Sequence, residues 1–135
     1  VAIRPGKPIL FAKISGRSKA IFGLPGNPIS SAACFRFFVY PYLRNLMGIQ
    51  EEKPIKAILK NKFSKKINFT RFVKSKISTT KNGKLEVEVL KGQESFRIKS
   101  LIQSNIWTLF PSGKSTFKKG EIVDCFFPHN SNKTF

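Results

Sequence analysis

A short turn between two apolar segments carries the residue types of an anion-binding site. The run Gly23-Leu24-Pro25-Gly26-Asn27-Pro28 follows a strand-like stretch and precedes a helix-like one. Asparagine is a favoured N-cap, and proline suits the first helical position because its missing N–H has no partner there anyway. The unpaired N–H groups and the positive dipole end of the helix then face whatever Gly26 allows to approach. The pattern predicts an anion cradle at residues 25–28, with an ordinary strand-to-helix turn as the alternative.

Two basic residues flank a second turn upstream. In Ile3-Arg4-Pro5-Gly6-Lys7-Pro8, the cations Arg4 and Lys7 stand on either side of a Pro-Gly pair, just before the strand-like residues 9–14. The first 50 residues contain seven Lys or Arg side chains and no carboxylate. Because Mg²⁺ takes oxygen ligands that usually include carboxylates, this part of the chain predicts anion binding without a metal site of its own.

In order along the chain, these turns resemble the molybdopterin molybdenumtransferases, the family of the bacterial MoeA enzymes and the gephyrin E domain. The resemblance rests on R-P-G-K-P and G-L-P-G-N-P-I-S, followed by a helix-like segment that ends F-F-V-Y-P-Y-L-R-N-L-M-G. It continues through Gly92-Gln93-Glu94-Ser95, Ser104-Asn105 and Lys119-Gly120-Glu121. It covers nearly the whole chain and concerns the C-terminal portion of the family's proteins.

The resemblance implies an enzyme of molybdenum cofactor biosynthesis. In this family adenylylated molybdopterin and molybdate react with the help of Mg²⁺, molybdenum is left on the pterin dithiolene, and AMP is released. The family's acidic metal positions lie upstream of the segment where this chain starts, so the chain alone is expected to be incomplete and inactive. The family further implies a homodimer with the active site between subunits and, through gephyrin, a non-catalytic scaffold as an alternative.

The resemblance also assigns roles to individual residues. It implies catalytic roles for Pro25 and Pro28 and substrate contacts for the other positions, of which two in the C-terminal part face the site across a subunit boundary. Arg4 stands where other members carry lysine, which keeps the charge but offers a bidentate fork. Glu94 places a carboxylate where a small residue is common. The implied anion-binding residues are Arg4, Lys7, Gly26, Asn27, Ser30, Arg71 and Ser95.

The elements that must position these residues fall into two parts. Residues 1–50 predict an α/β piece, the end of an open α/β sheet, with three strands and one long helix over residues 28–47 that Gly48 ends. Pro41 lies inside this helix and should kink or divide it, because its ring removes one backbone hydrogen bond and crowds the preceding turn. The expected apolar face of the helix includes Ile29, Ala32, Ala33, Val39, Leu43 and Leu46.

Residues 51–135 predict an all-β small barrel domain after a polar junction at residues 49–54. Short apolar or alternating runs are regularly separated by turn residues, which is typical of small barrels. The Asn82-Gly83 pair predicts a hairpin with a type I′ turn. The predicted strands cover residues 55–59, 71–77, 85–90, 96–102, 106–110 and 122–127.

The charge of the chain raises a second class of function. With 25 Lys or Arg against 7 Asp or Glu, the formal net charge is +18, which suits a nucleic-acid-binding module. Basic residues alternate with Phe63, Phe69 and Phe72, which could stack on bases. These aromatic residues nevertheless fall at strand spacing beside Ile and Val, which favours a core role. Specific nucleic-acid binding therefore remains the alternative.

Three other motifs give only weak indications of function. The run Ser112-Gly113-Lys114-Ser115-Thr116 matches the end of a P-loop, but Thr108 stands where that loop needs its first glycine, so a surface turn is predicted. His129 has no neighbouring ligand and is interpreted as part of the tail. Cys34 and Cys125 fit no zinc or disulfide pattern and are predicted to be buried.

The hydropathy and the first residue of the chain indicate where the protein is located and whether the chain is a piece of a longer protein. No run reaches the roughly 18–20 apolar residues that span a bilayer, and no signal peptide opens the sequence, so a cytoplasmic protein is expected. The chain begins at Val1 without an initiator methionine, which we interpret as a piece of something longer.

Overall fold

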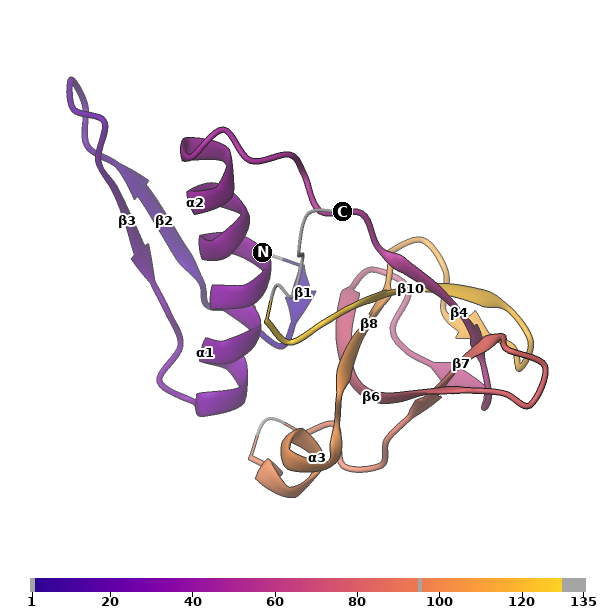
Figure 1. Cartoon of the computed structure of the whole chain (residues 1–135). Helices are drawn as coiled ribbons and strands as arrows, with labels where there is room; N and C mark the ends of the chain where they lie inside the picture. The colour runs from indigo at the N-terminus through magenta and orange to yellow at the C-terminus, as the bar shows by residue number, and fades with distance from the viewer. Residues whose placement is uncertain (1, 95, 130–135) are drawn as a thin grey trace.

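The structure, a computed structural model, describes residues 2–94 and 96–129. Five strands form a closed barrel in the order β6-β7-β4-β10-β8, which closes because β8 also pairs with β6 (Figure 1). Their bounds are β4 (Ile55–Leu59), β6 (Thr70–Thr79), β7 (Leu85–Val89), β8 (Ile106–Phe110) and β10 (Ile122–Phe126). The small barrel predicted for the second part of the chain is therefore confirmed. Within the described residues no helix is both long and apolar enough to cross a membrane.

The barrel interior is apolar because alternate residues of each strand point inward. One end is closed by the short pair β5 (Phe63–Ser64) and β9 (Thr116–Phe117). There the ring of Phe63 stacks on Phe110 and that of Phe117 meets it edge-on, with centroids 4.4 and 4.7 Å away. Phe63 is thus a core residue, as its strand spacing favours. The buried cluster comprises Ala57, Leu59, Val73, Val87, Val89, Ile106, Phe110, Phe117, Val123 and Cys125.

The first part of the chain has the three predicted strands and the long helix, but the three strands do not all pair with one another. Its elements are β1 (Ile3–Arg4), β2 (Leu10–Lys13), β3 (Ala20–Gly23), α1 (Pro28–Cys34), the π-helical turn η1 (Phe35–Val39) and α2 (Tyr40–Leu46). β2 and β3 form an antiparallel hairpin. β1 instead pairs in parallel with β6, so the chain's first strand extends the sheet of the barrel.

The long helix is continuous from α1 to α2, and Pro41 is accommodated by the π turn that precedes it. The N–H of Tyr40 bonds the carbonyl of Phe35, five residues back, so the ladder is already wider where the proline N–H is missing. The helix ends as predicted, with Gly48 at a φ of 68°.

The predicted apolar face of the helix is correct at Ile29 and Ala33. Ile29 and Ala33 are buried, and they pack on Phe72 and Trp107 of the barrel's outer face. A π turn carries one extra residue, so the residues after it are rotated away from the face that α-helical spacing predicts. Leu43 and Leu46, which follow the turn, are exposed, so their predictions are wrong. The prediction for Ala32, which precedes the turn, is wrong as well, because Ala32 is exposed beside the buried Ala33. The buried residues of the π turn and of α2 are instead two arginines, Arg36 and Arg44.

The strand predicted over residues 96–102 is wrong, because this segment contains the helix α3 (Ile98–Gln103). The period-two apolar residues Phe96, Ile98 and Ile102 are more than half exposed. Ser100 is buried instead, and its hydroxyl donates to the carbonyls of Gly92 and Arg97. Both edges of β6 are already paired with β7 and β8, so the closed barrel offers this segment no free edge there.

The hairpin predicted at Asn82-Gly83 forms, but its turn type is wrong. A type I′ turn needs positive φ at both central residues, and among the described residues only glycines have positive φ. The N–H of Gly83 instead bonds the Thr80 carbonyl at 3.0 Å, and the Thr80 hydroxyl accepts the N–H of Lys84. The hydrogen bond of the Thr80 hydroxyl therefore favours a connection between β6 and β7 that is longer than a two-residue turn.

Both thiols are buried, as predicted, and one carries a large pKa shift. Burial raises the pKa of Cys125 to about 11, although a hydrogen bond with Thr108 opposes the shift. Only the thiolate reacts, and at pH 8 roughly one Cys125 side chain in 1,000 is in the thiolate form. We expect native protein to take up no iodoacetamide at pH 8 and two equivalents in guanidinium chloride, measured by intact mass. Alkylation of native Cys125 within minutes at pH 8 would contradict the pKa and its burial.

Candidate anion-binding site

The turn at residues 25–28 begins the helix in the predicted way. Asn27 is the N-cap, and its side-chain oxygen accepts the N–H groups of Ile29 and Ser30 at 3.1 and 3.3 Å. The Ser31 hydroxyl donates to the carbonyl of Pro25 and closes the turn. A Cβ added at Gly26 would meet nothing within 4 Å, so the turn is open on that side.

The same cap changes what the turn can offer an anion. The amides of Ile29 and Ser30 are already bonded to Asn27, and Ser30 itself is buried with 8% exposure. An anion at this turn would therefore meet the dipole end of the helix and the open face of Gly26, but not those two amides.

The upstream turn is packed against the helix at Gly6. Gly6 has a φ of +116°, and an added Cβ would lie 2.7 Å from the sulfur of Cys34. Glycine is required here both by the backbone and by the contact. The carbonyl of Gly6 accepts the N–H of Ile9 at 2.9 Å. This contact fixes the course of the chain between Arg4 on one side and the exposed Lys7 on the other.

The structure brings Arg4 and Arg71 together within one chain. In the parallel pairing of β1 with β6, the two residues are register partners. The Arg4 guanidinium lies 4.9 Å from the ring centre of Phe69, and that of Arg71 lies 5.9 Å from the ring centre of Phe63. Arg71 therefore lies beside Arg4 in the same chain.

A third cation, Lys65, completes this cluster. Its side chain is 9% exposed, and the ammonium donates to the carbonyls of Lys114 and Lys66 at 2.7 and 3.4 Å. Burial lowers the pKa of Lys65, and the charge of Arg71 lowers it further. Burial and the Arg4 charge likewise lower the pKa of Arg71, against a smaller opposing effect of Glu94. We refer to Arg4, Lys65 and Arg71 as the cation cluster.

The cation cluster lacks internal neutralisation. Among the described residues, none of its three members forms an ion pair with a carboxylate, and the buried Nε atom of Arg71 has no hydrogen-bond partner. Burial and a neighbouring like charge disfavour the charged forms of Lys65 and Arg71. A bound anion would relieve both the repulsion and the unmet hydrogen bond.

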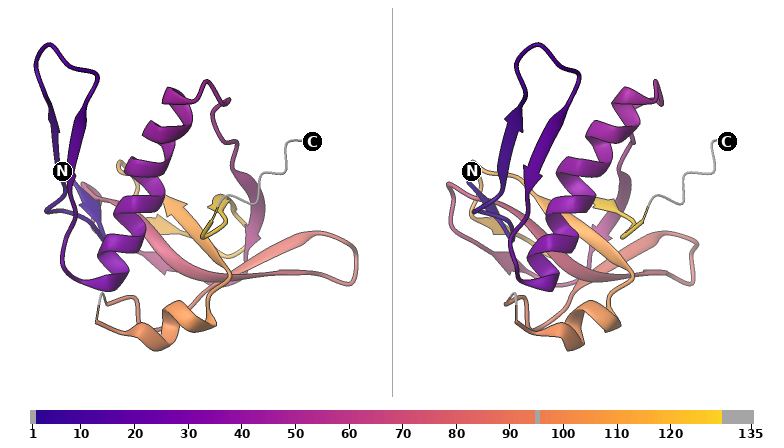
Figure 2. Two further views of the ribbon diagram at one scale, coloured as in Figure 1. Left: turned by 60° about the vertical axis from the view of Figure 1, so that its left-hand side comes forward. Right: turned by 90° about the vertical axis from the view of Figure 1, so that its left-hand side faces the viewer.

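A loop at residues 91–97 lies near these elements. In both views of Figure 2, and in Figure 1, its described residues 91–94 and 96–97 run beside the N-terminal end of α1. The Glu94 carboxylate forms an ion pair with Arg97, with Oε2 and Nε 3.2 Å apart. Burial lowers the pKa of Arg71 and of Lys74, and the negative charge of Glu94 opposes this lowering at both residues. Ser95, which the family resemblance places in the site, lies outside the described residues.

Some predicted residues are not joined to the cluster. Within residues 2–94 and 96–129, no hydrogen bond or ion pair links Lys7 or the turn at 25–28 to Arg71. Sequence reasoning missed Lys65 as an individual residue. Nothing in the sequence separates it from Lys62 or Lys66, because its burial arises from the pairing of β5 with β9.

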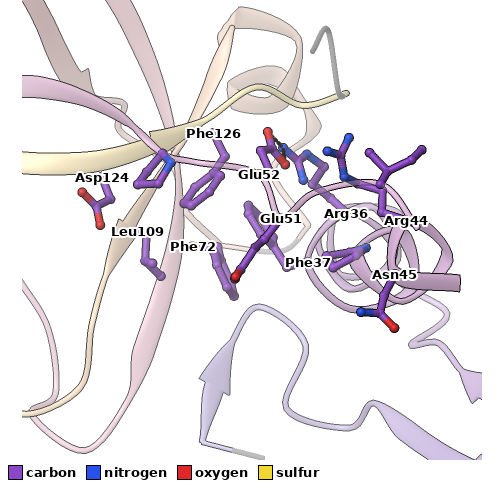
Figure 3. Close-up of a pocket in the computed structure, with 13 residues that line it drawn as sticks. Arg36, Phe37, Arg44, Asn45, Glu51, Glu52, Phe72, Leu109, Asp124 and Phe126 are labelled. Carbon is purple, nitrogen blue, oxygen red and sulfur yellow. Dashed lines mark hydrogen bonds and ion pairs between the residues drawn. The ribbon is translucent and has the colours of Figure 1, made fainter. Parts of the chain in front are cut away.

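A pocket of about 570 Å³ lies elsewhere, between α2, the junction at residues 49–54 and the barrel (Figure 3). None of the predicted site residues lines it. Its walls hold the stacked rings of Phe37 and Phe72, with centroids 3.8 Å apart, and the ion pair of Arg36 with Glu52 at 2.6 Å. The pocket marks the contact that seats the helix on the barrel, and we do not assign the anion site to it.

The structure does not favour a nucleic-acid platform. Phe72 is 8% exposed and packs under the helix, and Phe63 is half-buried against the core. Phe69 lies beneath the Arg4 guanidinium. The P-loop-like run forms an exposed turn over residues 112–115, as predicted, and enters β9 at Thr116. The ammonium of Lys114 forms an ion pair with the carboxylate of Glu121, with Nζ and Oε2 2.5 Å apart.

The described chain combines a small barrel, a capped helix and one basic turn, and comparisons with known proteins assign this combination to a family. The family model "MoeA C-terminal region (domain IV)" matches residues 56–126, and the model "Probable molybdopterin binding domain" matches residues 1–45. The chain belongs to the MoeA family, which confirms the resemblance noted in its two turns.

Individual relatives agree with this. The molybdopterin molybdenumtransferase of Staphylococcus aureus (strain COL) is 35% identical over 127 residues, covering 92% of this chain and 29% of the relative. That of Staphylococcus epidermidis (strain ATCC 12228 / FDA PCI 1200) is 34% identical over 134 residues, covering 98% and 31%. The crystal structure of the moeA protein from Pyrococcus horikoshii OT3 superposes with a TM-score of 0.73 at 28% identity, over 93% of this chain and 31% of that one. The chain spans less than a third of the length of these relatives.

Proposed function

We propose that this chain supplies the anion-binding part of a molybdopterin molybdenumtransferase. The enzyme would take molybdate and adenylylated molybdopterin, leave molybdenum on the pterin dithiolene and release AMP. The observation that carries the proposal is the cation cluster of Arg4, Lys65 and Arg71, which has no carboxylate partner among the described residues. Molybdate and both phosphate groups of the other substrate are anions of the kind such a cluster binds.

Within this proposal each residue has a limited task. Arg71 and Arg4 hold an oxyanion with charge-assisted hydrogen bonds, and Lys65 adds positive potential from a buried position. The turn with Pro25, Gly26, Asn27 and Pro28 directs the dipole end of the helix toward the substrate. Lys7 and Ser95 stay in the proposed site on the family resemblance, and Ser30 serves as a buried part of the turn.

The Mg²⁺ of the family's reaction does not fit the residues of this chain. The first 50 residues contain no carboxylate, and within the described ranges no group of three or more His, Cys, Asp or Glu side chains could hold a metal ion. As part of the proposal, the Mg²⁺ ligands belong to sequence outside these 135 residues, and the chain alone is inactive. The complete enzyme is proposed to be a cytoplasmic homodimer.

The test is AMP release from adenylylated molybdopterin with molybdate and Mg²⁺. The longer protein that contains this chain and the 135-residue chain are assayed side by side by chromatography. We expect release by the longer protein alone. Release by neither would overturn the enzyme assignment and favour a scaffold, and release by the short chain would overturn the argument that essential carboxylates lie outside it.

A further inference from the structure

Lys74, on the outer face of β6, has an unusual environment for a lysine. Its side chain is 1% exposed. The ammonium donates to three backbone carbonyls of one loop, those of Gly92, Glu94 and Arg97, at 3.0, 3.4 and 3.3 Å. An ammonium has three donors, so its hydrogen-bonding capacity is fully used by the loop.

The backbone of Lys74 holds the same loop a second time. Its N–H donates to the side-chain oxygen of Gln93 at 2.9 Å, and its carbonyl accepts from the Gln93 amide at 2.7 Å. The Gln93 amide also donates to the carbonyl of Leu90 at 2.6 Å. One residue of β6 therefore fixes the loop through both its side chain and its main chain.

The described residues held in this way, 91–94 and 96–97, run beside the N-terminal end of α1 (Figure 2). They include Glu94, the carboxylate whose charge acts on Arg71 of the cation cluster. We propose that Lys74 is a positioning residue that clamps this loop against β6 and so fixes one wall of the anion site. The inference rests on the proposed function for its effect on turnover, but not for the clamp itself.

Lys74 cannot serve the reaction directly. Its three donors are occupied, and its burial leaves no surface for a substrate. A neutral side chain of similar length would leave the Glu94 carbonyl without the Lys74 donor, and would leave the Gly92 and Arg97 carbonyls to share the single Ser100 hydroxyl, which is costly for a packed loop. Arginine keeps the charge and several donors, so it is the conservative variant that should restore part of the clamp.

The test compares Lys74→Met, Lys74→Arg and the control Lys76→Met in the longer protein. Lys76 is an exposed residue of the same strand. For Lys74→Met we expect faster hydrogen exchange confined to residues 91–97, and a KM for molybdate raised about tenfold. Lys74→Arg should recover most of both effects, and Lys76→Met should change neither.

The two readouts separate the clamp from simpler explanations. A purely structural loss would lower the active fraction and hence kcat, with KM for molybdate unchanged, and that result would overturn the positioning role. Unchanged exchange at residues 91–97 would overturn the clamp. If the wild-type protein released no AMP, the proposed function would fail, and the clamp would be judged on hydrogen exchange alone.

Discussion

Replacing Arg71 with alanine is expected to lower kcat/KM for AMP release by about 100-fold, without loss of stability. A charge-assisted hydrogen bond to an oxyanion contributes about 1.5–3 kcal/mol, and tenfold in rate corresponds to about 1.4 kcal/mol. Arg71 also lies beside the like charges of Arg4 and Lys65, and its Nε atom is buried without a partner. Its removal therefore takes repulsion out of the folded state and leaves the barrel intact.

The measurement pairs steady-state kinetics with thermal unfolding of the longer protein. Lys76→Ala is the matched control, because Lys76 is an exposed cation of the same strand. Wild-type kinetics for Arg71→Ala would remove this residue from the site. A large drop in unfolding temperature would instead show that Arg71 is mainly a structural residue.

The second large effect is expected for Glu52→Gln, which should destabilise the protein by about 3 kcal/mol. The carboxylate of Glu52 accepts two hydrogen bonds from one nitrogen of Arg36, at 2.6 and 2.8 Å, with side-chain exposures of 13% and 5%. The Nε atom of Arg36 also donates to the carbonyl of Phe127 at 2.7 Å. Loss of the carboxylate leaves a buried guanidinium without its counter-charge, at the contact that seats the helix on the barrel.

Urea unfolding measures this effect, and the neighbouring Glu51→Gln is the control. Glu51 is exposed, and among the described residues it forms no ion pair. We expect Glu51→Gln to change the free energy of unfolding by less than about 0.5 kcal/mol. Equal effects for the two variants would contradict the importance of the ion pair. A double-mutant cycle of Glu52→Gln with Arg36→Met would then give an interaction energy near zero between these two residues.

Local patterns predicted the elements that local chemistry decides. Asn27, Pro28 and Gly48 set the bounds of the helix, and alternating residues predicted the barrel strands. The segment at 96–102 failed because its period-two pattern gives no information about pairing, and the closed barrel leaves no edge for it beside β6. The register of the helix after Pro41 also failed, because a π turn shifts the buried face without a signal in the apolar spacing.

The site shows the same division. Arg4 was a candidate from its basic turn and Arg71 from the family resemblance, and the pairing of β1 with β6 explains why the two lie side by side. Lys65 and Lys74 were missed as individuals, because in a chain with 25 basic residues only tertiary packing distinguishes a buried lysine from an exposed one. The cap formed by Asn27 was predicted, but its consequence for the amides of Ile29 and Ser30 follows only from the hydrogen bonds.

The central claim is that this chain provides a working anion site to a molybdenumtransferase. Its most direct test is a chimera in which residues 1–135 replace the matching C-terminal segment of the Staphylococcus aureus molybdopterin molybdenumtransferase, assayed for molybdate-dependent AMP release. We predict release by the chimera and its loss when Arg71→Ala is introduced. A folded chimera that releases no AMP, or one whose release is unaffected by Arg71→Ala, would contradict the account.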